Sequence, residues 1–378
     1  MKPSERLLSL DVFRGITIMG MILVNNPGTW SAIYPQLEHA EWHGCTFTDL
    51  IFPFFLFIVG VAISYSLSKR KAQGGDMKSL YLNVFRRGII LFGLGLILAG
   101  FPFGLLFGHE FSWSTIRIPG VLQRIAIVYM IASILFLTTN TKFQYWFTGA
   151  ILIIYTMLMS LVPVPEVGYA NFEPGTNLSA WIDRLVLGNH LWSGTKLWDP
   201  EGVLSTIPAI GSAMLGIFTG NLLRSEKDPT TKTVWLYVLG SVLMVAGWGW
   251  SFWFPLNKNI WTSSYVLWTA GLALNFLAFC YWFIDVKKVT WWIKPFQVYG
   301  MNAITVFFLS GIVGRIMYMV KWNGADGSVV TIKSYLFDNF FLSWLEPINA
   351  SLAWAVVYIL IWLGLMWILY AKKIFIKV

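Results

Sequence analysis

Long apolar runs separated by short polar segments make up most of this chain of 378 residues. Several runs reach the roughly 20 residues that a helix needs to cross the hydrocarbon core of a bilayer. Because lipid offers backbone groups no hydrogen-bond partners, runs of this length predict transmembrane helices. The pattern therefore predicts an all-α fold, a polytopic membrane helical bundle of about ten transmembrane helices. The expected spans are 8–27, 47–68, 84–106, 118–138, 143–163, 203–223, 233–253, 260–284, 295–319 and 350–371.

Composition agrees with this interpretation. Charged residues make up 12% of the chain and hydrophobic residues 57%, whereas a soluble domain carries about 25% charged residues. No linker long enough to separate two soluble domains interrupts the runs, so we expect residues 1–378 to form a single transmembrane domain. The first run contains Asp11 and Arg14 and lacks a small-residue cleavage site, which argues against a removable signal peptide.

The distribution of Lys and Arg predicts an orientation. Most of the 27 Lys and Arg residues fall in segments that ten spans would place on one side, and cytoplasmic loops carry such an excess. We therefore expect both termini in the cytoplasm and the long loops 28–46, 164–202 and 320–349 outside. Nucleic-acid binding requires clustered basic patches, which these short loops do not supply, so no nucleic acid is expected as a partner.

The loop before the second span, HAEWHGCTFTDL at 39–50, is rich in chemically capable side chains. It holds two of the four histidines, and an imidazole is the usual proton-transfer group near neutral pH. His39 and His43 have a spacing that suits a metal, but no third ligand is evident, so no metal is expected. A loop histidine can equally be a hydrogen-bonded structural residue. Asp49 either orients a histidine or stabilises the start of the helix by its charge.

Polar residues inside the apolar runs form a second group of candidates, because a charge at membrane depth is costly. Arg124 lies about one turn inside the fourth span, and Asn302 lies in the ninth. Arg14 follows Asp11 by three residues, which fits either an interfacial ion pair or a phosphate ligand. Asn25 precedes a Pro-Gly pair that ends the first helix, so it projects near the outer surface or into a cavity.

The loop 164–202 is acidic and rich in Trp, Asn and Gly, a composition that suits sugars and amines but also an ordinary solvated loop. Asp199 and Glu201 form a turn that opens the sixth span. In that span, Gly216 and Gly220 predict close helix packing.

In this order, several segments resemble the heparan-α-glucosaminide N-acetyltransferases and their bacterial relatives, which are transmembrane acyltransferases. The longest segment fits the specific pattern HxxWxGxTxxDLxFPxFxFxxG. The chain lacks the lysosomal enzyme's large luminal N-terminal domain, so we expect a ten-helix bacterial form in the inner membrane. The segments, which run from residue 10 to about 304, are LDVFRGI, VNNPG, HAEWHGCTFTDLIFPFFLFIVG, RIPGVLQR, DPEGVLSTI, NKNIWTSSYV and YGMNAI.

The resemblance implies an enzyme that takes acetyl from cytoplasmic acetyl-CoA and passes it to an amino sugar or other saccharide on the periplasmic side. Motif by motif, His39 is the catalytic base or acetyl carrier and Asn25 the second active-site group, with Asp49 as the third catalytic candidate. The resemblance also suggests a homodimer surrounded by membrane lipid. The candidates for binding acetyl-CoA are Arg14, Arg86, Arg87, Arg124 and Asn302, and those for the saccharide are Trp42, Asp199 and Glu201.

Two other functions stay open at this point. A transporter or flippase for a glycan or lipid-linked sugar would line its path with Arg124 and Asn302, and would need neither acetyl-CoA nor His39. A structural membrane subunit would use the same residues for packing alone. For the enzyme, N- and O-acetylation are both open, as are direct transfer and an acetyl-His39 intermediate.

Overall fold

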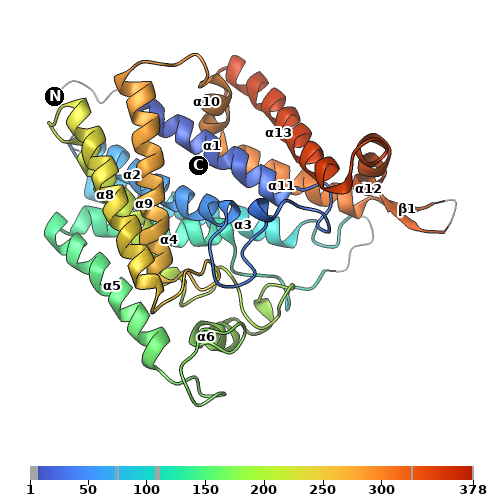
Figure 1. Cartoon of the computed structure of the whole chain (residues 1–378), viewed down its shortest axis with the longest axis horizontal. Coiled ribbons are helices and arrows are strands. Elements are labelled where there is room, and N and C mark those ends of the chain that lie inside the picture. Colours follow the sequence, from blue (N-terminus) through green and yellow to red (C-terminus); the bar gives the residue numbers. More distant parts are fainter. Residues whose placement is uncertain (1–6, 73, 75, 107–110, 325–326, 377–378) are drawn as a thin grey trace.

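The computed structural model of the protein describes residues 7–72, 74, 76–106, 111–324 and 327–376. Within this part of the chain, nine helices are long and apolar enough to cross a membrane, and two further helices form a tenth span bent by 81°. Each expected span has its counterpart, so the all-α membrane bundle is confirmed (Figure 1). The nine helical spans are α1 Leu8–Asn25, α2 Phe47–Ala72, α3 Met77–Gly100, α4 Val121–Thr138, α5 Thr141–Leu161, α7 Thr206–Arg224, α8 Pro229–Ser251, α9 Ser263–Cys280 continued by η3 Tyr281–Val286, and α13 Pro347–Ala371.

Helices α2 and α7 pack with their backbones in contact. A Cβ atom added to Gly60 would lie 1.9 Å from the Ala213 carbonyl oxygen, and one added to Gly216 would lie 2.0 Å from that of Phe57. Close approach of this kind is how small residues stabilise helix pairs in membranes, where lipid removes the hydrophobic driving force. The packing predicted from Gly216 and Gly220 is therefore confirmed.

The tenth span is interrupted at Asn302, between α10 Lys294–Met301 and α11 Ala303–Met319. The buried side-chain amide of Asn302 donates to the Ile374 carbonyl at 3.1 Å and accepts from the Ile376 amide at 2.9 Å. It thereby holds the segment after α13 beside the break. Irregular backbone at membrane depth is tolerated where protein surrounds it, and α10 packs closely on α1.

Loop contacts join segments that ten alternating spans place on the same side. At one end, named the loop end, the Gly44 amide donates to the Leu256 carbonyl, and the Ile118 amide to that of His190. At the opposite end, named the tail end, the Ser9 amide donates to the Asp285 carboxylate. The loop end comprises residues 26–46, 101–106, 111–120, 162–205, 252–262, 320–324 and 327–346, and the tail end comprises residues 7–9, 74, 76, 139–140, 225–228, 285–293 and 372–376.

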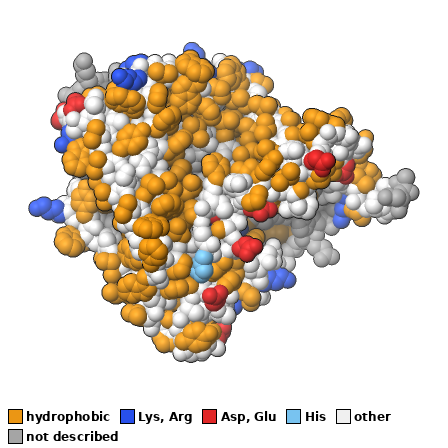
Figure 2. All heavy atoms as spheres, viewed as in Figure 1, with side chains coloured by type: hydrophobic (Ala, Val, Ile, Leu, Met, Phe, Trp, Pro, Cys, Tyr) orange, Lys and Arg blue, Asp and Glu red, His pale blue; other side chains and the backbone are white. Residues whose placement is uncertain are grey.

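Short elements cover the loop end. The strands β1 and β2 pair antiparallel, with Lys321 opposite Thr331 and Asn323 opposite Val329. Figure 2 shows hydrophobic side chains over most of one face, and acidic side chains around a histidine in its lower part. The elements are η1 Pro35–Leu37, α6 Leu178–Leu187, η2 Gly188–His190, β1 Lys321–Asn323, β2 Val329–Thr331, α12 Ile332–Phe337 and η4 Asp338–Leu342.

Gly216→Ala tests the contact between α2 and α7. The added methyl group meets the Phe57 carbonyl, so the substitution should cost about 1–3 kcal/mol and lower the apparent melting temperature in detergent. The control is Gly149→Ala on α5, where nothing lies within 4 Å of the added carbon and the melting temperature should hold or rise. Equal melting temperatures for the two variants would contradict the packing described.

Candidate active site at the loop end

Asp49 has both of the contacts that the sequence left as alternatives. It is the third residue of α2, and its Oδ2 atom accepts from the amides of Ala40 at 3.0 Å and Thr46 at 3.1 Å. The Thr46 hydroxyl donates to the same oxygen at 3.1 Å. Its other oxygen, Oδ1, lies 2.7 Å from Nδ1 of His39. One buried carboxylate therefore fixes the start of α2 and the orientation of His39.

The imidazole of His39 is placed to accept a proton. Because the Asp49 carboxylate can only accept a hydrogen bond, it selects the tautomer with the proton on Nδ1 and the lone pair on Nε2. The His39 side chain is 50% exposed, whereas that of Asp49 is 2% exposed. A reachable imidazole with a buried carboxylate behind it is the arrangement of a general base.

Lys258 is a member of this cluster that our sequence reasoning missed. Its Nζ atom lies 3.1 Å from Nε2 and 3.2 Å from Nδ1 of His39. Burial lowers the pKa of Lys258, and the Glu201 and Asp49 carboxylates act in the opposite direction. Lys258 and His39 are 219 positions apart, so their spacing in the sequence gave no sign of this contact. Lys258 does lie within the segment NKNIWTSSYV.

Trp42 anchors the histidine loop on the acidic loop. Its indole N–H donates to the Phe172 carbonyl at 2.7 Å, and its ring meets that of Trp198 edge-on at 5.1 Å between centroids. The neighbouring His43 lies 3.4 Å from the buried amide of Asn257. Burial lowers the pKa of His43, against the influence of Glu173.

Asp199 and Glu201, expected at the saccharide, are buried in an ion-pair cluster. Arg117 holds Asp199 through two hydrogen bonds of 2.6 and 2.8 Å, and Glu201 through one of 2.5 Å. Burial acts to lower the pKa of Arg117, but the two carboxylates raise it overall. The neighbouring Asp183 accepts from the Val203 amide, and burial raises its pKa to about 6.

Arg124 lies at the same end of the bundle, in the first turn of α4. It is 1% exposed, and its Nη2 atom donates to the Gly202 carbonyl at 3.0 Å and to the Ser205 hydroxyl. Its guanidinium carbon lies 5.2 Å from the ring centroid of Trp261. Its Nε and Nη1 atoms make no hydrogen bond within the described part of the chain. The structure therefore groups Arg124 with the loop-end cluster, away from Arg14.

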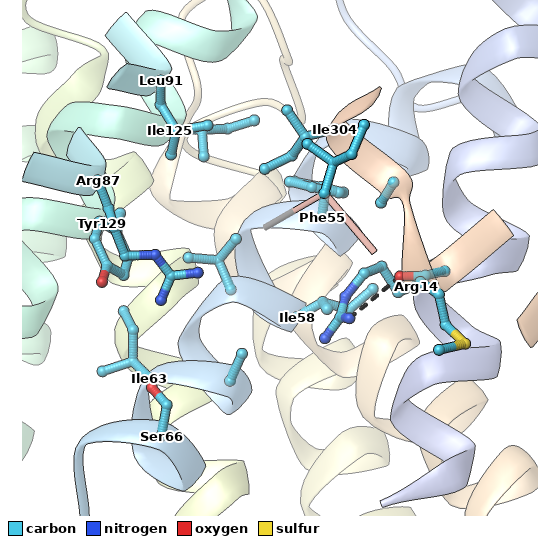
Figure 3. Close-up of a pocket in the computed structure, with 16 residues that line it drawn as sticks. Arg14, Phe55, Ile58, Ile63, Ser66, Arg87, Leu91, Ile125, Tyr129 and Ile304 are labelled. Carbon is cyan, nitrogen blue, oxygen red and sulfur yellow. Dashed lines mark hydrogen bonds between the residues drawn. The ribbon is translucent and has the colours of Figure 1, made fainter. Parts of the chain in front are cut away.

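Arg14 and Arg87 share a cavity of about 210 Å³ between α1, α2, α3, α4 and the broken span. Figure 3 shows both guanidinium groups pointing into the same space from opposite walls. Arg14 contacts the Gly300 carbonyl at 3.4 Å, and Arg87 lies 5.7 Å from the Tyr129 ring centroid. Arg86 is exposed and does not line this cavity. Asn302 contributes indirectly, because the Ile376 that it holds is part of the wall.

Two more cavities, of about 460 and 310 Å³, continue along α3, α4 and α11 toward the loop end. They share four residues of their walls, including Phe307 and Arg315. Asn25 is exposed and lines the smaller one, as the sequence allowed. Within the described residues, the hydrogen bonds and cavity walls do not bring Asn25 together with His39, although both lie toward the loop end.

A family model described as "Heparan-alpha-glucosaminide N-acetyltransferase, catalytic" matches residues 6–249. The chain belongs to this family. Heparan-alpha-glucosaminide N-acetyltransferase of Mus musculus is 29% identical over 99% of this chain and 61% of its own length, and that of Homo sapiens is 29% identical over 99% and 60%. The chain thus spans about three fifths of the length of these relatives. The heparan-α-glucosaminide N-acetyltransferase family match contains His39, Asp49 and Asn25, while Lys258 lies beyond it.

Cys45 provides a test of the cluster that is independent of any activity. Burial, followed by the Asp49 carboxylate, raises the pKa of Cys45 to about 12, so little thiolate is present near neutral pH. In a Cys280→Ser background, alkylation of Cys45 by a maleimide at pH 8 should be more than about a hundredfold slower than that of free cysteine. Asp49→Asn should accelerate it, because a negative charge is removed. A wild-type rate equal to that of free cysteine would contradict the site.

Proposed function

We propose that this protein is a transmembrane acetyltransferase that moves acetyl from acetyl-CoA, bound toward the tail end, to an amino sugar or other saccharide at the loop end. The observation that carries the proposal is the hydrogen bond between His39 Nδ1 and Asp49, which equips an accessible imidazole to accept a proton. The names of the mouse and human relatives support the same reaction class.

The orientation follows from the charges. Most of the Lys and Arg residues lie in the segments that ten alternating spans place on the same side as the tail end, so this end faces the cytoplasm and holds both termini. The loop end then faces the periplasm of a bacterial inner membrane. Acetyl-CoA is made in the cytoplasm, so the donor and the saccharide reach the protein from opposite sides.

The donor's phosphates fit the cavity of Arg14 and Arg87. Guanidinium groups match phosphate oxygens in geometry and charge, and Arg14, which also pairs with the Asp11 carboxylate at 3.4 Å, and Arg87 both line this cavity. The rest of the wall is mainly apolar and suits a narrow pantetheine arm. From Arg14 to Asn25 the rise along α1 is about 16 Å, and the three cavities follow α3, α4 and α11 over this interval.

In the transfer step, Nε2 of His39 takes a proton from the acceptor's ammonium or hydroxyl group, and Asp49 stabilises the resulting imidazolium. The acceptor nitrogen or oxygen then bonds to the acetyl carbon, the C–S bond breaks, and the departing thiolate receives the proton. The Asn25 amide donates a hydrogen bond to the developing oxyanion. In the alternative, Nε2 itself carries the acetyl group in a covalent intermediate.

The remaining candidates take supporting positions in this proposal. Trp42 offers a partly exposed ring for a sugar face. The charged groups of Arg124, Asp199 and Glu201 are bound by protein atoms. They therefore contribute to the electrostatic field at the loop end and do not bind the ligand directly. Asn302 holds the tail segment at the wall of the donor cavity.

The first test is acetyl-CoA turnover by the detergent-purified protein with glucosamine and a panel of other sugars. His39→Ala should lower kcat by about 10²–10⁴-fold, because proton transfer by a positioned side chain contributes this much. His43→Ala, four residues away, is the matched control and should stay near the wild-type kcat. Melting temperatures of all variants must agree for the comparison to hold.

Two results would change the interpretation. Acceptor-dependent thiol release that survives in His39→Ala would remove His39 from the chemistry while keeping the enzyme. No release with any sugar, together with no thermal shift on adding acetyl-CoA, would favour a transporter or flippase.

Arg86 and Arg87 provide a matched pair for the donor site. Arg87→Gln should raise KM for acetyl-CoA by about tenfold or more, because a hydrogen bond to a charged group contributes about 1.5–3 kcal/mol. Arg86→Gln should leave it unchanged, since Arg86 lies outside the cavity. With acetyl-pantetheine, which lacks the nucleotide phosphates, both variants should match the wild type. An equal effect of the two substitutions would contradict the assignment.

A further inference from the structure

The cavity that Asn25 lines at the loop end contains two cationic side chains. Arg315 enters it from α11 and Lys333 from α12, and Arg315 also lines the neighbouring cavity of about 460 Å³. Lys333 is 5% exposed, and Arg315 is partly buried. Among the described residues of the two cavity walls there is no Asp or Glu.

The contacts of Lys333 with described residues bring no negative charge to it. Its Nζ atom donates to the Pro27 carbonyl at 2.7 Å and to the Tyr318 hydroxyl at 2.5 Å, and it lies 4.5 Å from the centroid of the Tyr318 ring. These partners are neutral. Burial lowers the pKa of Lys333 to about 8, so the amine is still mostly protonated at neutral pH.

Among the described residues, Arg315 also has no anionic partner. In the described part of the chain it makes no hydrogen bond or ion pair, and the nearby charge of Arg117 repels it. The carboxylates at this end that Arg117 binds, Asp199 and Glu201, make no ion pair with Arg315. Two partly desolvated cations in one cavity are unfavourable unless an anion joins them.

We propose that Arg315 and Lys333 form an anion subsite, which selects acceptor saccharides that carry a carboxylate or sulfate group. This inference rests on the proposed function and specifies its acceptor. The guanidinium fork of Arg315 matches a planar or tetrahedral oxyanion, and Lys333 supplies a second fixed charge. Because Asn25 lines the same cavity, the bound anion would hold the sugar beside the proposed transfer site.

Neither the family match nor the proposed donor site includes this subsite. Residues 315 and 333 lie beyond the matched segment 6–249. The donor's phosphates have their own cations, Arg14 and Arg87, in a different cavity. A phosphate of a lipid headgroup has the same chemistry as the saccharide's anion, so the experiment must separate these two sources.

The first arm measures binding without catalysis, in a neutral detergent free of lipid. Glucosamine 6-sulfate should raise the melting temperature of the wild type more than glucosamine does. Arg315→Gln should weaken this binding by about tenfold, as expected for a lost charged hydrogen bond. Lys321→Gln, an exposed lysine on β1, is the matched control and should bind as the wild type does.

The second arm measures turnover. Arg315→Gln should raise KM about tenfold for glucosamine 6-sulfate and leave KM unchanged for glucosamine and for acetyl-CoA. Arg315→Lys, which keeps the charge, should recover part of the loss. This rescue distinguishes charge recognition from damage to the fold.

The third arm adds vesicles of phosphatidylglycerol or of phosphatidylcholine. If the subsite serves the saccharide, both vesicles leave the sulfate preference intact, whereas displacement by phosphatidylglycerol alone would overturn the assignment to the acceptor. Binding that does not depend on Arg315, or an equal loss for both sugars, would overturn the subsite. Arg315-dependent binding without acetyl transfer would instead refute the proposed enzyme and leave the subsite standing.

Discussion

The carboxylate of Asp49 connects the elements on which the loop end depends. One oxygen orients His39, the other holds the backbone amides that begin α2, and the Asp49 carbonyl accepts from the Tyr265 hydroxyl on α9. The residue is 1% exposed, so the hydrogen bonds from His39, Ala40 and Thr46 to its carboxylate offset the cost of burying the charge. The position of His39 is thus tied to two transmembrane helices, although His39 itself lies in a loop.

The same demand for internal partners explains the broken span. A bend of 81° leaves backbone groups without their helical partners, and lipid could not satisfy them. Asn302 and the tail segment bind each other at this point, while α10 packs so closely on α1 that a Cβ on Gly300 would lie 2.2 Å from the Asp11 carbonyl oxygen. The break therefore places the donor cavity, the tail and Arg14 beside one another.

The sequence predicted the spans because a membrane-crossing helix is a local property of about 20 residues. It could not separate Arg86 from Arg87, since adjacent residues differ by about 100° around a helix and α3 is apolar on every side. Long-range pairs were also out of reach. Arg117 meets Asp199 across 82 positions, which turned two expected saccharide ligands into partners of an arginine. The contact between Lys258 and His39 also joins residues far apart in the sequence, so it could not be predicted either.

The charges divide into two kinds, and this division bears on function. Arg117 is bound by the Asp199 and Glu201 carboxylates, and Arg14, which shares a cavity with Arg87, pairs with the Asp11 carboxylate at 3.4 Å. The cavity of Arg315 and Lys333 has no carboxylate among the described residues of its wall. The two cavities follow one another along α3 and α11. Two separate anionic ligands, a donor and an acceptor, would each occupy one cavity, and their reactive groups would meet near Asn25, which lines the cavity of Arg315 and Lys333.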